Sequence, residues 1–365
     1  MTHTTIDAVS LGEGLNRYGP TAARPTSPKR TALDTTTVDI HSHVAVPEAA
    51  AYVAPYQNVG DIAMVKYADE ETKAINQRQD QDRRIAMTDL ADRLQVLDKL
   101  GIDFQVVAPP PFQCYYNVPV DHAVTASRMV NDGIAAFVDQ RPDRFAGLGT
   151  VPLQDPGQAV VELERAVRDL KLKGVQVLTN VNGNELSDPE LEPFWKKAEE
   201  LGALVMIHPN GFTEGRRFTR FYFSNVIGNP LETTVALHFL IFDGVLERHP
   251  DLKILAVHGG GFLPAYSGRI DHAWGARKDS NAGLSRPPTE YLRRIYFDSV
   301  VFTPHQLEYL VRVYGADRIV MGTDYPYDMA DYDPVQHVLS VPSFSKDEIA
   351  KVAGGTAMAL LGLSR

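Results

Sequence analysis

The sequence predicts an α/β protein that folds as a single (β/α)8 TIM-type barrel. Short runs of β-branched and apolar residues alternate along the chain with longer segments of helical period, which is typical of parallel strands joined by helices. Eight such runs occur, and eight strand–helix units close into a barrel, whereas a doubly wound sheet rarely needs so many. The length of 365 residues fits a barrel that carries insertions.

The expected strands are short apolar runs bounded by turn residues. In order they are Val38–His43, Phe104–Ala108, Phe145–Val151, Val175–Thr179, Ala203–His208, Lys253–His258, Ile295–Ser299 and Arg318–Gly322. Helical spacing is found in Leu90–Lys99, Asp121–Gln140, Pro156–Leu170, Pro189–Leu201, Pro230–Arg248, Leu263–His272, His305–Tyr314 and the group Pro334–Leu363. Several of these segments begin with proline or a small polar residue, as helices do.

Two segments fall outside this repeating pattern. Residues 1–34 mix Thr, Pro, Arg and Gly without periodicity, so we expect a flexible N-terminal arm there. Residues 35–365 are expected to form the barrel domain, in which the segment around 47–89 is long for a first strand-to-helix connection. Long connections of this kind usually cover a site, so this one is expected to be a cap or lid.

Charge and composition exclude several partners. The net charge is −10 and no run of Lys or Arg stands out, so neither nucleic acid nor an anionic membrane is an expected partner. No stretch is apolar enough to span a bilayer. The single cysteine, Cys114, excludes an internal disulfide, and residues 1–34 lack the apolar core of an export signal. A cytoplasmic location is therefore the expectation.

Histidines gather at the predicted carboxyl ends of the strands, where barrel enzymes place their functional groups. His41 and His43 end the first strand, and strand residues two apart point the same way. His208 ends the fifth strand, and Asp324 follows the eighth. Three imidazoles and a carboxylate are ligands that Zn²⁺ accepts, so we predict that these four residues bind one divalent metal ion. His258, which ends the sixth strand, is expected beside the metal as a catalytic proton-transfer group.

Each of these residues has a simpler explanation when it is taken alone. His208 precedes Pro209 and could be a strand-end residue bonded to backbone. The glycines after His258 could serve only a tight turn, or let backbone N–H groups approach an anion. Asp324 could stabilise a turn before Pro326. Only their common position at strand ends favours the metal site over these alternatives.

A set of ordered motifs resembles the amidohydrolase-related decarboxylases. The motifs are Val38-Asp39-Ile40-His41-Ser42-His43, His208-Pro209, Gly228-Asn229-Pro230-Leu231-Glu232-Thr233-Thr234, His258-Gly259-Gly260-Gly261, Gly268-Arg269-Ile270-Asp271-His272 and Gly322-Thr323-Asp324-Tyr325-Pro326. The likeness extends from about Thr37 to Leu363 and is greatest to the aminocarboxymuconate semialdehyde decarboxylases. It implies a distorted barrel with one divalent metal, usually Zn²⁺, that releases CO2 from a small carboxylic acid without an organic cofactor. Some relatives carry glutamate at the position of His41 and often use Mn²⁺, so retention of this histidine favours zinc.

The resemblance also implies roles for individual residues. The histidine that matches His258 handles protons, and Asp324 is a second candidate for protonating carbon. The arginine that matches Arg269 reaches into the site of a neighbouring subunit, which implies a homodimer. A second arginine binds the substrate carboxylate, and Arg84 is its nearest match, with Arg83 adjacent to it. Either predicted arginine could instead be a solvated or ion-paired surface residue.

The substrate and the reaction stay open at this point. The residues around Arg84 and the segment Phe112-Gln113-Cys114-Tyr115-Tyr116 depart from the family pattern. Tyr115, Tyr116 and Phe302 could pack against an unsaturated or aromatic acid. The same metal site could alternatively hydrolyse or hydrate a related lactone, amide or ring-cleavage acid. A decarboxylase needs arginines to hold the departing carboxylate, whereas the hydrolase of a neutral ester does not. A binding module without activity would need neither these arginines nor His258.

Overall fold

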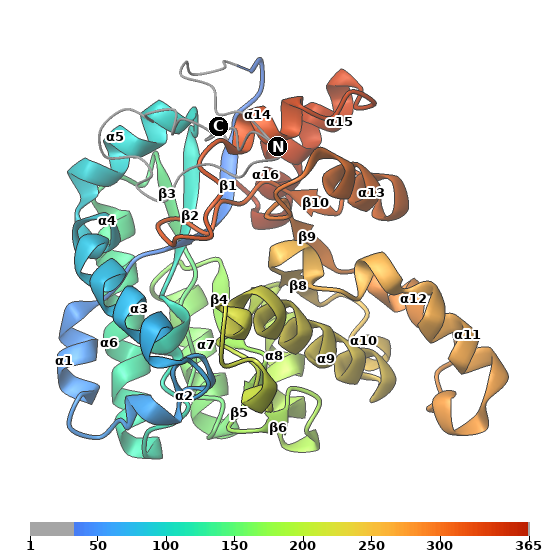
Figure 1. Ribbon diagram of the computed structural model, residues 1–365, viewed down its shortest axis with the longest axis horizontal. Coiled ribbons are helices and arrows are strands. Elements are labelled where there is room, and N and C mark those ends of the chain that lie inside the picture. Colours follow the sequence, from blue (N-terminus) through green and yellow to red (C-terminus); the bar gives the residue numbers. More distant parts are fainter. Residues whose placement is uncertain (1–32, 364–365) are drawn as a thin grey trace, which may run out of the picture.

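The computed structural model describes residues 33–363, and in this part of the chain eight parallel strands form a closed barrel (Figure 1). They are β1 (Val38–His43), β2 (Phe104–Ala108), β3 (Phe145–Gly147), β4 (Gly174–Leu178), β7 (Leu204–His208), β8 (Lys253–Ala256), β9 (Tyr296–Asp298) and β10 (Ile319–Val320). One sheet has the order β1-β2-β3 and the other β10-β9-β8-β7-β4. Parallel bridges from Gly149 to Val175 and from Ser42 to Tyr325 join the two sheets at both edges. The predicted barrel is confirmed.

Helices surround the strands and account for the segments of helical period. They are α1 (Pro47–Val53), α2 (Ala63–Lys66), α3 (Glu70–Asp82), α4 (Arg84–Thr88), α5 (Leu90–Leu100), α6 (Val120–Asp139), α7 (Pro156–Arg168), α8 (Glu192–Leu201), α9 (Asn229–Phe242), α10 (Val245–Arg248), α11 (Gly268–Ala276), α12 (Pro288–Leu292), α13 (Pro304–Tyr314), α14 (Pro334–Leu339), α15 (Lys346–Ala350) and α16 (Thr356–Leu361). Asp89 and Asp155 cap α5 and α7 by accepting backbone N–H bonds. A small hairpin, β5 (Asn180–Val181) and β6 (Asn184–Glu185), follows β4.

The strands are buried because helices cover the barrel. Every residue of β1 and β7 is buried, and an apolar core continues from the strands to the surrounding helices. The register pairs His43 with Ala108 and Leu178 with His208, so the carboxyl ends of the strands lie at one mouth. This mouth is where the predicted site residues are expected to meet.

Several predicted strands are longer than the observed ones. The strand predicted at Phe145–Val151 stops at Gly147, because the side chain of Asn131 takes both backbone groups of Thr150, at 2.7 and 2.9 Å. The strand predicted at Lys253–His258 stops at Ala256, because His258 adopts a positive φ of 54°. The strand predicted at Arg318–Gly322 is reduced to two residues.

The segment around 47–89 is helical, which the sequence pattern did not indicate. It contains α1 to α4, and α3 is largely exposed, so it lacks the apolar stripe that marks a helix packed on a core. Among the helices of residues 33–363, none combines the length and the hydrophobicity needed to cross a bilayer. The expected N-terminal arm, 1–34, lies outside the described residues except for its last two positions.

Candidate active site

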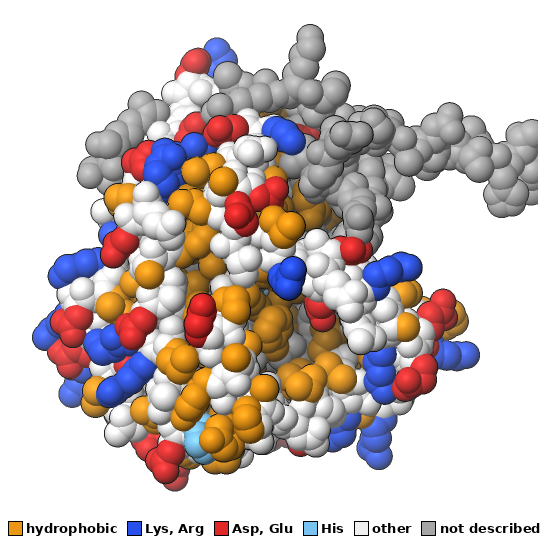
Figure 2. Space-filling model, turned by 90° about the vertical axis from the view of Figure 1, so that its left-hand side faces the viewer, with side chains coloured by type: hydrophobic (Ala, Val, Ile, Leu, Met, Phe, Trp, Pro, Cys, Tyr) orange, Lys and Arg blue, Asp and Glu red, His pale blue; other side chains and the backbone are white. Residues whose placement is uncertain are grey.

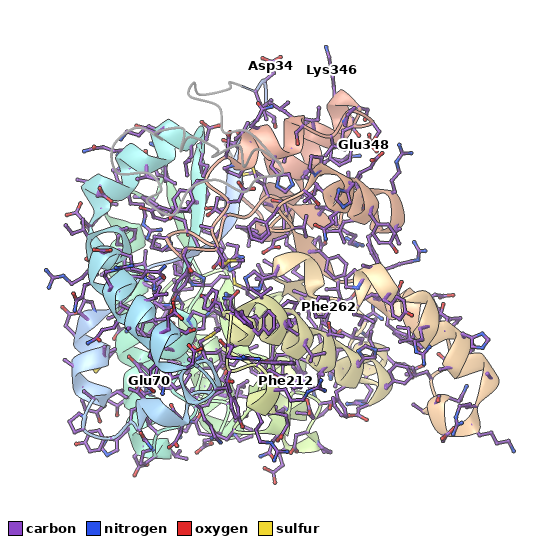
Figure 3. All side chains as sticks on the ribbon, in the orientation of Figure 1. Asp34, Glu70, Phe212, Phe262, Lys346 and Glu348 are labelled. Carbon is purple, nitrogen blue, oxygen red and sulfur yellow. The ribbon has the colours of Figure 1, made fainter. Side chains whose placement is uncertain are left out.

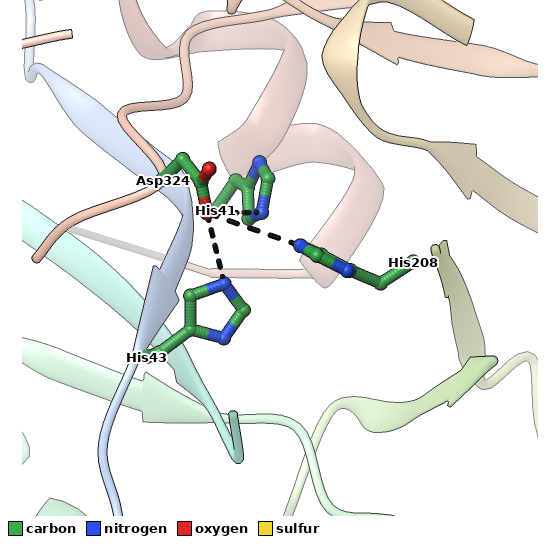
Figure 4. A group of neighbouring side chains, drawn as sticks. All are labelled: His41, His43, His208 and Asp324. Atoms are coloured by element: carbon green, nitrogen blue, oxygen red, sulfur yellow. Dashed lines mark hydrogen bonds and ion pairs between the residues drawn. The ribbon is translucent and has the colours of Figure 1, made fainter. Parts of the chain in front are cut away.

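Four predicted residues meet at the mouth of the barrel. His41 and His43 come from the end of β1, His208 from the end of β7, and Asp324 from the loop after β10 (Figure 4). Asp324 Oδ1 lies 3.3 Å from His41 Nε2, 3.1 Å from His43 Nε2 and 3.8 Å from His208 Nε2. One ligand atom from each of the four residues lies within 4.8 Å of every other, and all four residues are buried. The geometry therefore gathers a His3–Asp metal site.

The hydrogen bonds of the three histidines orient them for metal binding. Nδ1 of His41 faces Asp298 Oδ2 at 2.7 Å, while Nδ1 of His43 and of His208 face the carbonyls of Pro109 and Pro209, at 3.1 and 2.7 Å. Each Nδ1 has only an acceptor beside it, so it carries the proton, and Nε2 of the neutral ring is left with a bare lone pair.

These lone pairs need a cation. Nε2 of His41 and of His208 is buried without a hydrogen-bond donor, and each points toward the carboxylate of Asp324, which is itself an acceptor. Acceptors that converge in a buried site repel one another unless a positive charge lies between them. A divalent ion bound by three imidazoles and one carboxylate satisfies all of them, so the residues present fit a metal.

Burial and neighbouring charges set the protonation of the four clustered residues. Burial lowers the pKa of His208 to about 3 and also lowers the pKa of His43, so both rings are neutral, as metal ligands must be. Burial alone would raise the pKa of Asp324, but the neighbouring histidines hold it well below its usual range. Burial opposes the charge of His41 too, yet the carboxylates of Asp324 and Asp298 raise its pKa to about 10. Without a metal, His41 is the ring that carries the compensating proton.

Backbone geometry places the two residues that follow strands. His258 and Asp324 have φ values of 54° and 63°, in the left-handed region that side chains other than glycine rarely adopt. The backbone N–H of Asp324 donates to the carbonyl of His41 at 2.8 Å, which fixes the loop after β10 to β1. Backbone strain of this kind persists only where the surrounding structure imposes it, and such positions cluster at functional sites.

His258 lies beside the metal cluster, as predicted, without being one of the four clustered ligands. Its Nε2 is 3.4 Å from the other carboxylate oxygen of Asp324, Oδ2, and its ring lies about 5 Å from those of His41 and His208. Its Nδ1 is buried and has no hydrogen-bond partner. This imidazole can therefore exchange a proton with a molecule bound at the cluster.

A network of hydrogen bonds between buried polar side chains supports β1. Arg93 is fully buried and donates to the carbonyl of His43 at 2.5 Å, to that of Ala86 at 2.7 Å and to Gln105 Oε1 at 3.0 Å. Gln105 in turn donates to Asp39, which accepts the backbone N–H of His41 at 3.1 Å. This network thus links the helical 47–89 segment to β1, the strand that carries His41 and His43.

A cavity of about 280 Å³ opens onto the metal cluster. His208, His258 and Asp324 of the site line it, together with residues of the 47–89 segment, namely Gln57, Val59, Ile62, Met64, Val65, Asn76, Asp80 and Arg83. Figure 2 shows the face that carries these inserted helices, on which hydrophobic side chains lie among charged ones. The volume suits a small molecule rather than a polymer.

The structure separates the two neighbouring arginines of the insertion. Arg84, the predicted substrate ligand, is exposed and does not line the cavity. The side chain of Arg83 is only 10% exposed and lines the cavity, where it contacts Asp80 at 2.9 Å and lies 4.8 Å from the ring of Tyr327. Two of its donors, Nε and Nη1, are buried without a partner. The helical phase of α3 and α4, which the sequence pattern did not reveal, selects Arg83.

The other predicted substrate contacts lie elsewhere. Arg269 is exposed on α11 and does not reach this cavity within its own chain. Tyr115 and Tyr116 line a neighbouring cavity of about 380 Å³, and Phe302 lines neither. The two cavities share the lining residues Ile62, Pro111, Phe112 and Asn210.

Sequence reasoning missed several residues of the site. Asp298, the partner of His41, ends β9, and its position at a strand end was a usable signal. Tyr222, Tyr327 and Asp328 line the cavity from loops, where no periodicity marks them. The ring of Tyr327 packs edge-on against His43, at 5.2 Å between centroids.

Comparison with known proteins relates this chain to one protein family. The model of the family described as Amidohydrolase matches residues 38–363. A 2-amino-3-carboxymuconate-6-semialdehyde decarboxylase of Dictyostelium discoideum is 36% identical over 272 residues, which cover 74% of this chain and 76% of that protein.

Solved structures show the same fold. The 5-carboxyvanillate decarboxylase of Sphingomonas paucimobilis superposes with a TM-score of 0.79 at 28% identity, over 91% of this chain and 100% of that one. The 5-carboxyvanillate decarboxylase of Novosphingobium aromaticivorans, complexed with manganese and 4-hydroxy-3-methoxy-5-nitrobenzoic acid, gives a TM-score of 0.77 at 23% identity, over 93% and 100%.

Proposed function

The chain belongs to the amidohydrolase family. We propose which of its residues bind the metal, hold the substrate and move the proton in its reaction. It is a metal-dependent, non-oxidative decarboxylase of a small unsaturated or aromatic carboxylic acid. The observation that carries this conclusion is the buried His3–Asp cluster at the end of a small cavity, with His258 and Arg83 beside it. The relatives favour decarboxylation over the hydrolase or hydratase alternative.

We propose His41, His43, His208 and Asp324 as the metal ligands and Zn²⁺ as the ion, with Mn²⁺ as the alternative. Three imidazoles suit zinc, whereas manganese prefers sites richer in oxygen ligands. A divalent ion in this position supplies Lewis-acid chemistry, which stabilises the negative charge that develops when CO2 leaves. No organic cofactor is needed for this reaction class.

The chain's own side chains bind the substrate and move the proton. Arg83 can donate a charge-assisted hydrogen bond to the carboxylate from Nε or Nη1, since both lack other partners. His258 protonates the carbon that loses CO2, because its ring lies beside the cluster and lines the cavity. We propose Asp324 as a second, weaker proton carrier. The insertion 47–89 acts as the lid that keeps water from the departing carboxylate.

Decarboxylation is tested by measuring CO2 release from a panel of 2-hydroxybenzoates and unsaturated dicarboxylic acids, alongside hydrolysis of lactones and amides. We expect CO2 release from at least one acid and no hydrolysis above background. Hydrolysis without CO2 release across the panel would reverse the assignment of the reaction.

Replacing Arg83 with alanine is expected to raise KM about 10- to 100-fold, because the substrate carboxylate loses a charge-assisted hydrogen bond. Arg84→Ala is the matched control, since the neighbouring side chain is exposed and lies outside the cavity. Steady-state kinetics of CO2 release measure both. Equal effects of the two substitutions would show that neither arginine binds the carboxylate.

Metal binding is expected to release about one proton per ion near pH 8. The pKa of His41 in the metal-free protein is raised to about 10, so at pH 8 this ring is protonated and must lose the Nε2 proton to become a ligand. Titration calorimetry in buffers of different ionisation enthalpy measures the number of protons. A heat of binding that does not depend on the buffer would contradict this account of His41.

We propose that the protein acts as a homodimer in which Arg269 reaches the site of the partner subunit. Helices α11 and α12 project away from the barrel (Figure 1), and Phe262 precedes them at the surface (Figure 3). Phe262 is 46% and Tyr266 70% exposed, so two large hydrophobic side chains are exposed in the segment that leads to Arg269. Arg269→Ala is expected to lower kcat/KM about 10-fold or more while light scattering still shows a dimer. A fully active monomer would refute the shared site.

A further inference from the structure

Besides the metal cluster, the cavity carries a carboxylate to which the proposed reaction assigns no role. Asp328 lies in the loop after β10, four residues beyond Asp324, and lines the same 280 Å³ cavity. Its side chain is half-buried, and burial raises its pKa, which the nearby positive charge of Arg83 opposes. Partial burial of a carboxylate in a ligand cavity costs free energy unless hydrogen-bond donors contact its oxygens.

Asp328 has unused capacity to accept hydrogen bonds. The side-chain hydrogen bond that the structure gives it comes from the hydroxyl of Tyr222, at 3.4 Å, which is long for a bond between two oxygens. An ionised carboxylate has about four lone-pair positions. Arg83 acts on it through charge at longer range, because the closer partner of that guanidinium is Asp80, at 2.9 Å.

The cavity lining therefore has polar groups besides the metal cluster and His258. Asp328 and Tyr222 form one such pair, and apolar side chains such as Ile62, Val65 and Met329 lie in the same lining. A small ring whose reacting carboxylate lies at the cluster would present its other substituents to this lining, which includes Asp328.

We propose that Asp328 determines substrate specificity by accepting a hydrogen bond from a hydroxyl or amino group on the substrate, at a position away from the departing carboxylate. This inference rests on the proposed function of the same cavity. A donor at that position satisfies the carboxylate, whereas a methyl group leaves it unpaired and a second carboxylate is repelled. The preferred substrates are accordingly unsaturated or aromatic acids that carry such a donor.

The test compares Asp328→Leu, which is close in size and has no acceptor, with Tyr222→Phe, which removes the hydroxyl that contacts Asp328. The ligands are 2-hydroxybenzoates that carry a hydroxyl, amino, methyl or carboxylate group at each other ring position. Dissociation constants for the metal-loaded enzyme are measured by calorimetry, and kcat/KM is measured for every acid that is turned over.

For at least one ring position, we expect the native enzyme to bind the hydroxyl or amino compound about 10- to 100-fold more tightly than the methyl compound. Asp328→Leu should reduce this preference to less than about threefold, while Tyr222→Phe should retain it. Loss of the preference in both variants to the same degree would show that Asp328 only positions Tyr222, and an unchanged preference in Asp328→Leu would overturn the proposal.

The binding measurement separates this inference from the proposed reaction. If the acids bind with the expected preference but none releases CO2, the assigned reaction fails and the role of Asp328 stands. If CO2 is released and the preference for a donor is absent from the native enzyme, the reaction stands and the role of Asp328 fails.

Discussion

Replacing His258 with asparagine is expected to lower kcat by about 10²- to 10⁴-fold while one metal ion per chain stays bound. The ring lies 3.4 Å from Asp324 Oδ2, close to the cluster, but the four proposed ligand atoms come from other residues. Its removal should therefore take away the proposed proton donor and leave the proposed metal ligands in place. Asparagine keeps a polar side chain at a position whose φ is 54°, which asparagine tolerates well.

Two measurements separate this role from a structural one. Metal content by elemental analysis should be unchanged, and KM should change much less than kcat, because the lost interaction acts in the transition state. His305→Asn, on the exposed surface of α13, is the matched control and should retain native kinetics. A variant that loses metal together with activity would place His258 among the ligands, and one with native kcat would remove it from the mechanism.

The metal cluster could be predicted from the sequence because each of its residues lies at or just after the end of a strand that a short apolar run marks. His41 and His43 share a strand face by their spacing, and His208 and Asp324 each follow an apolar run that the barrel topology directs to the same mouth. Once eight strands were recognised, the closure of the barrel determined that these ends meet. The eight strands of the barrel lie within, or one residue beyond, the predicted runs, whereas the short hairpin of β5 and β6 was not predicted.

The remainder of the cavity could not be predicted in this way, because it is built from loops and from a helical insertion without a strong apolar stripe. Arg83 and Arg84 are adjacent, and only the observed turn from α3 into α4 decides which one faces the cavity. Tyr222 and Asp328 are 106 residues apart and meet through loop conformations that no periodicity encodes. Asp298 is different, since it ends a strand and could have been recognised as a partner for a ligand histidine.

The ligand substitutions His41→Ala and Asp324→Ala should have the largest effect of all, with metal content and activity lost together. Each removes one of four ligands from a buried site in which the remaining lone pairs repel one another. Asp298→Asn should have an intermediate effect. It keeps all four proposed ligands but replaces the carboxylate whose Oδ2 lies 2.7 Å from His41 Nδ1 and orients that ring. This change should weaken metal binding by about 10- to 100-fold without abolishing it.

Thermal unfolding provides a measurement that is independent of turnover. Added metal should stabilise the native enzyme according to its concentration relative to the dissociation constant, by about 2.7 kcal/mol at a hundredfold excess over that constant. The same addition should leave the melting temperatures of His41→Ala and Asp324→Ala nearly unchanged, and Asp298→Asn should require a proportionally higher metal concentration. Native metal stoichiometry in both ligand variants would mean that the ion binds elsewhere. The convergence of β1, β7 and the loop after β10 would then need another explanation, in which a proton on His41 compensates the charge of Asp324.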